Sequence, residues 1–327
     1  MPLTKRLGPA TRDAYGKVLA ELGATRPEIV VLDADLAKST RSDDFRKRFP
    51  DRFFNVGISE ANLVGIAGGL AASGKVPFIS SFACFLMCKG YDQLRMAIAY
   101  PRLNVKVVGS HGGISAGEDG ASQMSIEDVA LATSLPGFTV VVPADAPSAE
   151  ALTRAMAAHP GPVYIRTGRP KAPIVHEKTE GLALGKGVLL RDGTDLALIA
   201  NGLMVWEALE AADRLQADGV RAAVADLHTI KPLDEKMVAD LARRCGAIVC
   251  AEEHQVWGGL GSAVARAVGE SCPVPIGFVG IADTYAESGD PDALLRRYGL
   301  TADRIVEVAR KTMQNKRQRQ QARAMGG

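Results

Sequence analysis

The first residue that could do chemistry in this 327-residue chain is an acid, Glu60, at the predicted start of a helix. Glu60 follows Ser59, and the next residues, ANLVGIAGGLA, place Leu63, Ile66 and Leu70 at helical spacing. The pattern predicts a helix with Ser59 as its N-cap. An acid in the first turn suits the helix dipole, and that alone explains most such residues. The same carboxyl, if buried, would have a raised pKa and could hold a proton near neutral pH. The residues themselves leave both interpretations open.

A glycine-rich segment over 107–130 contains a second group. The strand-like run VKVVGS ends at Ser110, and HGGISAGEDG follows with His111 and Asp119. Loops at the carboxyl ends of parallel strands are where α/β folds bind ligands. His111 and Asp119 could therefore contact a hydroxylated or phosphorylated substrate. A polar surface loop explains the same residues equally well.

Two arginines complete the candidates. Arg166 ends the strand-like run PVYIRT, and Arg12 stands near the start of the first helical pattern. A guanidinium group suits a phosphate because it can donate two parallel hydrogen bonds. An ordinary ion pair is the simpler explanation for either arginine taken singly.

These residues belong to an alternation of strands and helices. β-branched runs at 28–35, 105–110, 138–145 and 162–167 are separated by helical patterns, which predicts an α/β fold with a parallel sheet covered on both faces. A second series follows, with strands near 195–202, 221–228 and 246–254. The segment between the two, near 172–190, is rich in Pro, Gly and charge. We therefore expect two doubly wound domains, 1–175 and 190–312, followed by a basic tail, 313–327.

Composition narrows the class of protein. The chain is 47% hydrophobic, has five Cys and carries a net charge of +2, and no stretch resembles a signal peptide or a membrane span. A soluble, cytoplasmic protein that does not bind nucleic acid is expected. Six Lys and Arg residues lie from Arg310 onward with no acid among them, so the rest of the chain has a net charge of −4. The basic end lacks aromatic residues, which favours a solvated or frayed segment over a binding site for RNA or anionic lipid.

Three motifs are incomplete. Residues 69–76 nearly form a phosphate-binding loop, but Val76 stands where a Ser or Thr must reach magnesium. Gly259 and Gly261 favour a tight turn between a strand and a helix over a dinucleotide loop, because Val264 occupies the third small position. Cys84 and Cys88 have no companion ligands, so no metal site is predicted.

Taken in order, these segments resemble the transketolase family from about residue 8 to 310. The matching runs are GISEANLVGIAGGLA, SSFACFLMCKGYDQLRMA, SHGGISAGEDG, VYIRTGRP and DADL, and IKPLD with EEH…GGLGSAV resembles the family's C-terminal domain. The resemblance implies a pyrimidine-binding domain followed by a transketolase C-terminal domain that is structural. It implies a catalytic, cofactor-binding role for Glu60, cofactor contacts for Phe82, Phe85 and Asp35, and substrate contacts for Arg12, Ser39, His111, Asp119 and Arg166.

The implied activity is transfer of a two-carbon ketol unit from a ketose phosphate to an aldose phosphate with thiamine diphosphate. A protonated Glu60 would hydrogen-bond the aminopyrimidine ring of the cofactor, and the phenylalanines would stack on it. One departure concerns the diphosphate site: no Gly-Asp-Gly followed by Asn is present. We therefore expect one half of a split transketolase, whose partner chain holds the diphosphate and Mg²⁺. A homodimer core of this chain within a heterotetramer is expected.

A second departure concerns the substrate loop. Gln123 stands where the family usually has a His, four residues after Asp119. Glutamine donates and accepts hydrogen bonds but does not titrate near neutral pH. We hypothesise that the sugar is specialised, for example branched or sulfonated. The alternatives are the beta subunit of a 2-oxo-acid dehydrogenase decarboxylase, half of a deoxyxylulose-phosphate synthase, and a non-catalytic scaffold subunit.

Overall fold

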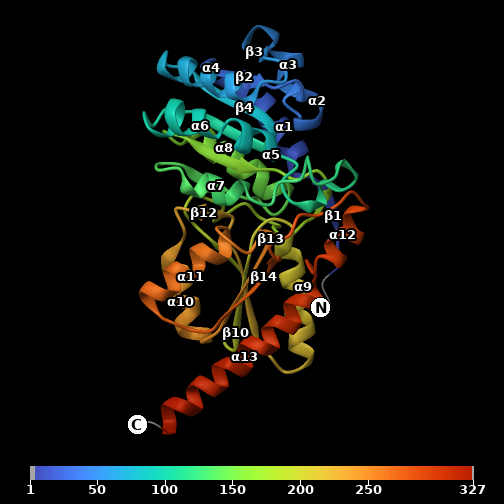
Figure 1. The fold of residues 1–327 in the computed structure, drawn as a ribbon, viewed down its shortest axis with the longest axis vertical. Helices are drawn as coiled ribbons and strands as arrows, with labels where there is room; N and C mark the ends of the chain where they lie inside the picture. The colour runs from blue at the N-terminus through green and yellow to red at the C-terminus, as the bar shows by residue number, and fades with distance from the viewer. Residues whose placement is uncertain (1–3, 326–327) are drawn as a thin grey trace.

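The computed structural model describes residues 4–325 and shows two α/β domains, one above the other in Figure 1. The first is built on a seven-stranded sheet in the order β12-β6-β7-β5-β4-β2-β3. The six strands that come from the first half of the chain are parallel: β2 (Ile29–Asp33), β3 (Phe53–Asn55), β4 (Val76–Phe82), β5 (Lys106–Ser110), β6 (Thr139–Val141) and β7 (Val163–Arg166). Strands β2, β4, β5 and β7 are buried along their whole length, as expected for a sheet covered on both faces.

Helices cover the two faces of this sheet. On one face, α1 (Thr11–Thr25), α3 (Asp43–Arg48) and α8 (Ala146–Ala158) pack through Tyr15, Leu19, Phe45 and Leu152. The other face carries α4 (Glu60–Ala72), α5 (Ala83–Lys89), the π-helical turn η2 (Leu94–Ala99) and α7 (Asp128–Ser134). Because α4 and α5 flank β4, the residues at the end of that strand lie beside the start of both helices.

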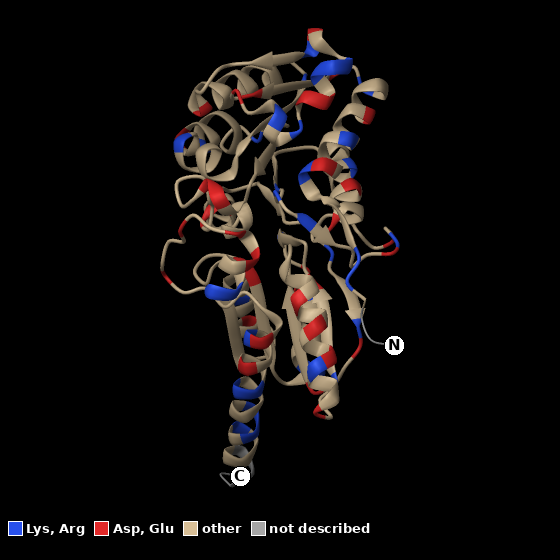
Figure 2. Ribbon diagram, turned by 90° about the vertical axis from the view of Figure 1, so that its right-hand side faces the viewer, with Lys and Arg blue, Asp and Glu red and all other residues tan. Residues whose placement is uncertain are grey.

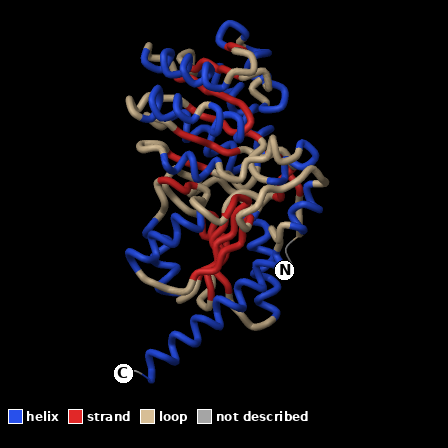
Figure 3. Tube along the Cα trace, viewed as in Figure 1, coloured by secondary structure: helices blue, strands red, loops and turns tan. Residues whose placement is uncertain are grey.

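The second domain has a five-stranded sheet in the order β14-β13-β10-β11-β9, which Figure 3 shows between its helices. Its strands are β9 (Val188–Arg191), β10 (Leu196–Ala200), β11 (Ala222–Asp226), β13 (Ile248–Gln255) and β14 (Ile276–Ile281). Helices α10 (Glu235–Cys245) and α11 (Leu260–Ser271) cover one face, and α9 (Met204–Ala217), α12 (Pro291–Arg297) and α13 (Ala302–Met325) cover the other.

The predicted α/β class and the strands named from the sequence are confirmed, but the sheets are not wholly parallel. Strand β9 pairs antiparallel with β11, and β12 (Thr229–Lys231), from the second half of the chain, pairs antiparallel with β6. Strand β12 thus extends the sheet of the first domain. The segment expected to be a linker also begins with a strand, β8 (Lys171–Pro173), which pairs with β1 (Leu7–Ala10). The domains are therefore joined by shared elements, which a local pattern does not reveal.

The junction buries a histidine between two carboxylates. His176 Nδ1 lies 3.2 Å from Asp145 Oδ1 at the start of α8, and its Nε2 lies 3.3 Å from Asp226 Oδ2 at the end of β11. All three residues are at most 3% exposed. Burial lowers the pKa of His176, but the two carboxylates outweigh it and raise this pKa to about 9. The junction is therefore held by a charged imidazole.

The C-terminal segment differs from the expected frayed tail. Helix α13 runs without a break from Ala302 to Met325 and projects from the second domain (Figure 1). Lys316 donates to the carbonyls of Asp195 and Cys245 at 3.0 and 2.7 Å, so the predicted tail contributes to the packed domain. Gly326 and Gly327 of that tail lie outside the described residues. Among those described, no helix is both long and apolar enough to cross a membrane.

Candidate active site

Glu60 is buried at the first position of α4, 3% exposed. Its Oε1 accepts a hydrogen bond from Ser81 Oγ at 3.1 Å, and Ser81 is itself fully buried on β4. Ser59 precedes the helix as predicted, but its side chain makes no capping bond. The serine that orients Glu60 comes from the neighbouring strand, 21 residues along the chain. No local pattern indicates it.

Two phenylalanines follow Ser81 in the chain: Phe82 is the last residue of β4, and Phe85 lies in α5. The rings of Phe82 and Phe85 are stacked, with centroids 5.5 Å apart and planes 18° apart. Phe82 is buried and also stacks on the His111 imidazole, at 3.9 Å between centroids. Phe85 is half-buried, and Lys89 Nζ lies 4.5 Å from its ring centroid. The expected aromatic platform is thus shared with a histidine, and Phe85 is the more accessible ring.

His111 and Arg12, 99 residues apart in sequence, are in contact. Arg12 Nη1 lies 3.1 Å from His111 Nε2 and donates to the carbonyl of Ser39 at 3.1 Å. Burial, reinforced by the charges of Arg12 and Arg169, lowers the pKa of His111 to about 3. His111 is therefore a neutral imidazole, and its Nδ1 lies 2.8 Å from Ser110 Oγ. Arg12, His111 and Ser39 form one polar cluster beside the phenylalanines.

The remaining predicted residues are Asp35, Asp119 and Gln123. Asp35 is exposed after β2, has φ of 66° and accepts from Asn55 Nδ2 at 2.8 Å. Asp119 is exposed at the end of the 3₁₀ turn η3 (Ile114–Asp119), close enough for its charge to raise the pKa of Arg12 against the larger lowering effect of burial. Gln123 is half-buried, and its Oε1 accepts from Ser122 Oγ at 2.6 Å.

The structure does not support the phosphate role expected for Arg166. This residue is 5% exposed, and its Nη2 pairs with Asp128 at 2.9 Å and with the Ser125 carbonyl at 2.5 Å. Its Nη1 donates to the Glu253 carbonyl at 2.7 Å. Although burial lowers its pKa, the neighbouring acids raise that pKa overall. Arg166 is therefore an internal arginine, because both terminal nitrogens already have protein partners.

Arg169, three residues further along, is the more accessible of the two arginines. Its charge lowers the pKa of both Arg12 and His111, secondary to burial in each case. It donates to the Ala116 carbonyl and to Glu118 Oε2, both at 2.5 Å, and a third of its side chain is exposed. The sequence VYIRTGRP offers both arginines, and a strand ending at Arg166 places Arg169 beyond the sheet edge.

The glycine-rich loop approaches protein groups closely. A Cβ on Gly112 would lie 2.1 Å from Arg166 Nε, and one on Gly113 would lie 2.1 Å from Glu253 Oε1. Gly113 also has φ of 84°, in the region that favours glycine. These glycines are explained by packing of the loop on Arg166 and Glu253. Among the described residues no cluster of three or more His, Cys, Asp or Glu could hold a metal ion.

Fold and site together define the class: an α/β subunit that presents a buried acid and stacked aromatic rings at the edge of a parallel sheet. Comparison with known families agrees. Residues 8–174 match the family "Transketolase, pyrimidine binding domain", and residues 185–305 match "Transketolase, C-terminal domain". The chain belongs to the transketolase family.

Individual relatives include subunits of split enzymes. The chain is 44% identical over 305 residues to the 6-deoxy-6-sulfo-D-fructose transketolase subunit SqwH of Clostridium sp. (strain MSTE9), covering 93% of this chain and 95% of that protein. It is 36% identical to a subunit of the apulose-4-phosphate transketolase of Phocaeicola vulgatus (strain ATCC 8482), covering 92% and 96%. A solved structure titled "Split gene transketolase, inactive beta4 tetramer" superposes with a TM-score of 0.87 at 48% identity, covering 94% and 99%.

Proposed function

We propose that this chain forms a transketolase active site together with a partner chain that carries the diphosphate and Mg²⁺ site. The observation that carries the proposal is the placement of Glu60: a buried carboxyl, oriented by Ser81 and adjoining the end of β4 that carries Phe82. A non-catalytic scaffold requires neither a buried acid nor an aromatic pair. The similarity to subunits of split transketolases supports the sugar enzyme over the beta subunit of an oxo-acid dehydrogenase.

The described residues fit the pyrimidine half of thiamine diphosphate. Glu60 Oε1 is engaged by Ser81, and among the described residues no hydrogen bond to Oε2 is found, so Oε2 would be available to hydrogen-bond a ring nitrogen. Phe85 would supply an apolar surface, and the exposed Asp35 would add a carboxylate. When bound, the cofactor supplies the carbon nucleophile and the electron sink for ketol transfer.

Arg12 and Arg169, with His111 and Ser39, would hold the anionic end of the sugar. Burial first, and then the charges of both arginines, lowers the pKa of His111, so the imidazole stays neutral and the two guanidinium groups make the site positive. A phosphate or sulfonate offers oxygens to both arginines. Binding this remote group orients the sugar carbonyl, so its energy lowers the barrier to reaction. Asp119 and Gln123 would contact sugar hydroxyl groups.

The sugar itself is best sought among modified ketoses. Gln123 replaces the histidine expected in this loop, and two similar subunits are named for a sulfonated fructose and for apulose 4-phosphate. A sulfonate and a phosphate place comparable oxygens before Arg12 and Arg169. We propose a ketose with a terminal anionic group as the donor and a cytoplasmic setting, consistent with five free cysteines among the described residues.

Assembly would use the exposed apolar face of α4. Ile58 and Ile66 are 78% and 38% exposed, and Met96 and Tyr100 of the adjacent segment are 49% and 81% exposed. Among the described residues, nothing lies within 4 Å of a Cβ built on Gly65 or Gly69. An open apolar face of this kind fits a second copy of the chain. Two copies joined there, each bound to one partner chain, would make a heterotetramer.

The test is reconstitution with a partner chain that carries the diphosphate-binding domain. We expect thiamine diphosphate to bind the complex and ketol transfer to follow. A panel of donors should include xylulose 5-phosphate, fructose 6-phosphate and 6-deoxy-6-sulfofructose. If xylulose 5-phosphate with ribose 5-phosphate exceeds every alternative in kcat/KM, the specialised sugar is wrong. If the complex takes up no cofactor, the catalytic proposal itself is wrong.

A further inference from the structure

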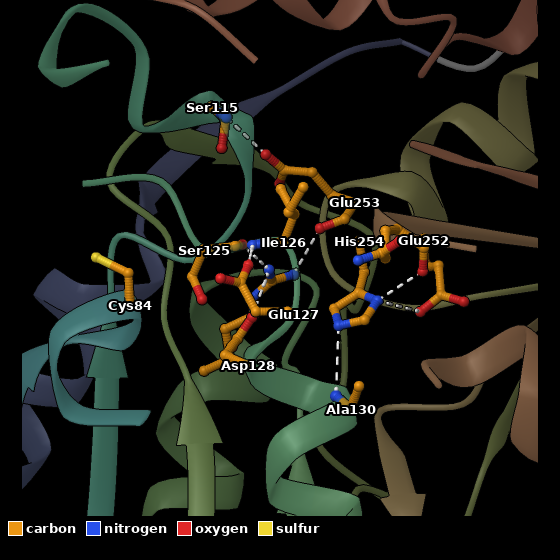
Figure 4. A network of polar contacts seen from close by, with 12 residues as sticks. Cys84, Ser115, Ser125, Ile126, Glu127, Asp128, Ala130, Glu252, Glu253 and His254 are labelled. Atoms are coloured by element: carbon orange, nitrogen blue, oxygen red, sulfur yellow. Dashed lines mark hydrogen bonds and ion pairs between the residues drawn. The ribbon is translucent and has the colours of Figure 1, made fainter. Parts of the chain in front are cut away.

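The turn η3, which ends at Asp119, is held by groups from the second domain. Ser115 N donates to Glu253 Oε1 at 2.6 Å, a contact visible at the upper centre of Figure 4. At the other end of the turn, Ser288 Oγ donates to the Glu118 carbonyl at 2.6 Å. Both contacts join residues more than 130 positions apart. The two ends of the turn therefore depend on the second domain.

Glu253 is itself fixed at both its main chain and its side chain. It lies near the end of β13, 6% exposed, and its carbonyl accepts from Arg166 Nη1 at 2.7 Å. Its carboxylate packs on the bare Cα of Gly113 and points to Ser115, which is 1% exposed. A buried N–H that loses its acceptor cannot turn to water. The position of Ser115 N thus depends on the Glu253 oxygen.

The second contact comes from the segment before α12. Ser288 precedes Gly289 and Pro291, and a Cβ on Gly117 would lie 2.8 Å from Pro291 Cγ. Gly117 has φ of 78° and lies within η3. The middle of the turn is therefore pressed against this segment, while Ser288 bonds to its end.

From these contacts we propose that Glu253 and Ser288 are positioning residues for the substrate loop. Among the described residues, neither has a hydrogen bond to Glu60, Arg12 or His111; they hold the turn that follows His111 and Gly113 and ends at Asp119. The C-terminal domain is then part of the substrate-binding machinery, in addition to being a structural unit. This inference rests on the proposed function only where sugar binding is concerned.

The first test follows amide hydrogen exchange in the full-length chain over residues 112–123. Glu253→Ala removes the acceptor of Ser115 N, so exchange there should rise about tenfold. Glu253→Gln keeps a side-chain oxygen that can accept the same hydrogen bond. The exchange rate at Ser115 in this variant should therefore lie within about twofold of that in the parent protein. Ser288→Ala should raise exchange near Glu118 by a smaller factor. Thr284→Ala is its matched control, because Thr284 is an exposed hydroxyl on the same segment that bonds to Tyr285.

The second test is kinetic and uses the complex with the partner chain. Glu253→Ala and Ser288→Ala should raise KM for the sugar about fivefold while kcat stays within about twofold, because only positioning is lost. Glu253→Gln should restore KM. A purely structural role would instead lower the active fraction, which reduces kcat and leaves KM unchanged.

The outcomes separate this inference from the proposed function. Unchanged exchange over 112–123 in both Glu253→Ala and Ser288→Ala overturns the positioning roles, whatever the activity. Equal effects of Glu253→Ala and Glu253→Gln also overturn the assignment to Glu253, since charge and not the acceptor would then matter. If Glu253→Ala does not fold, the comparison of exchange near Glu118 in Ser288→Ala and in Thr284→Ala tests the proposal. Lack of ketol transfer by the parent complex contradicts the proposed function, while the exchange result still stands.

Discussion

Two arginines three positions apart show how much the surroundings of a residue decide. Arg166 is enclosed by Asp128, Ser125 and Glu253, whereas a third of the Arg169 side chain is exposed and its charge acts on His111. Their types and their place in VYIRTGRP predict phosphate binding equally well. The difference is that one guanidinium lies beneath the substrate loop and the other lies beyond the sheet edge.

The acid at the start of α4 leads to the first prediction. Glu60→Gln cannot supply or accept a proton, so the reconstituted complex should lose most ketol transfer, at least about 100-fold, while its assembly is unchanged. Steady-state turnover and size-exclusion chromatography with light scattering measure the two properties. Activity within about tenfold of the parent enzyme would contradict the role of Glu60.

The arginine pair leads to the second prediction. Arg169→Ala should raise KM for an anionic sugar about tenfold or more, with a change in stability below about 1 kcal/mol, because its ion pair with Glu118 is exposed. Arg166→Ala should instead cost about 3–5 kcal/mol, since it leaves the Asp128 carboxylate buried without its cation. Sugar kinetics and urea denaturation of both variants check this. If Arg166→Ala raised KM with little loss of stability and Arg169→Ala lost stability instead, Arg166 would be the phosphate-binding residue.

At the scale of elements, α4 is apolar on both its buried and its exposed face. Leu63, Val64 and Ala67 are buried against the sheet, while Gly65, Ile66 and Gly69 face outward. A helix that is apolar all round is buried on all sides in its native setting. The element itself therefore indicates an oligomer.

The third prediction places a charge on this face. Ile66→Glu should weaken self-association of the chain by at least about tenfold, because a carboxylate would be desolvated in an apolar contact. Sedimentation velocity over a range of concentrations measures it. Leu189→Glu, at a similarly exposed apolar residue on β9, is the control and should leave association unchanged. Equal association of both variants would remove α4 from the interface.

The fourth prediction concerns His176, which lies in the segment after β8. Its side chain contacts Asp145 at the start of α8 and Asp226 at the end of β11. Its pKa is about 9 when folded against about 6.5 unfolded, so its stabilising effect is complete below pH 6.5 and is lost as pH rises through 9. The shift corresponds to roughly 3 kcal/mol. The difference in unfolding free energy between the parent and His176→Gln should therefore shrink between pH 6.5 and 9.

Urea denaturation across this pH range measures that difference. Lys106, whose pKa burial lowers to about 7, titrates in the same window with the opposite sign, and subtraction of the variant cancels its effect. The control is His159→Gln, since burial lowers the pKa of His159. A difference that is flat in pH would exclude a charged imidazole at the junction.

At the scale of the whole molecule, the projecting helix carries a run of positive charge without a nearby acid in the sequence. Figure 2 shows Lys and Arg along the lower end of α13, and no acid follows Glu307 in the sequence. Yet Lys316 bonds to two carbonyls of the second domain, so this part of the helix is packed. Part of the basic segment is structural, and only the end beyond it projects.

The fifth prediction separates these two parts. A chain ending at Thr312 should lose about 2 kcal/mol of stability, because the carbonyls of Asp195 and Cys245 lose a charged donor. A chain ending at Gln320 keeps Lys316 and should unfold within about 0.5 kcal/mol of the parent protein. Chemical denaturation of the two truncated chains decides. Equal stability of both would restore the solvated tail that composition predicts.

The sequence by itself determined the α/β class, the main strands and the family, because strand runs and helix periodicity are local and the motifs keep their order. It also predicted that Glu60 begins a helix. It did not reveal that Ser81 orients this acid, that His111 stacks on Phe82, or that Arg166 is internal, since those contacts join separate elements. The role of Glu253 and Ser288 is likewise decided by tertiary structure: the second domain packs on the substrate loop, and only folding brings the two together.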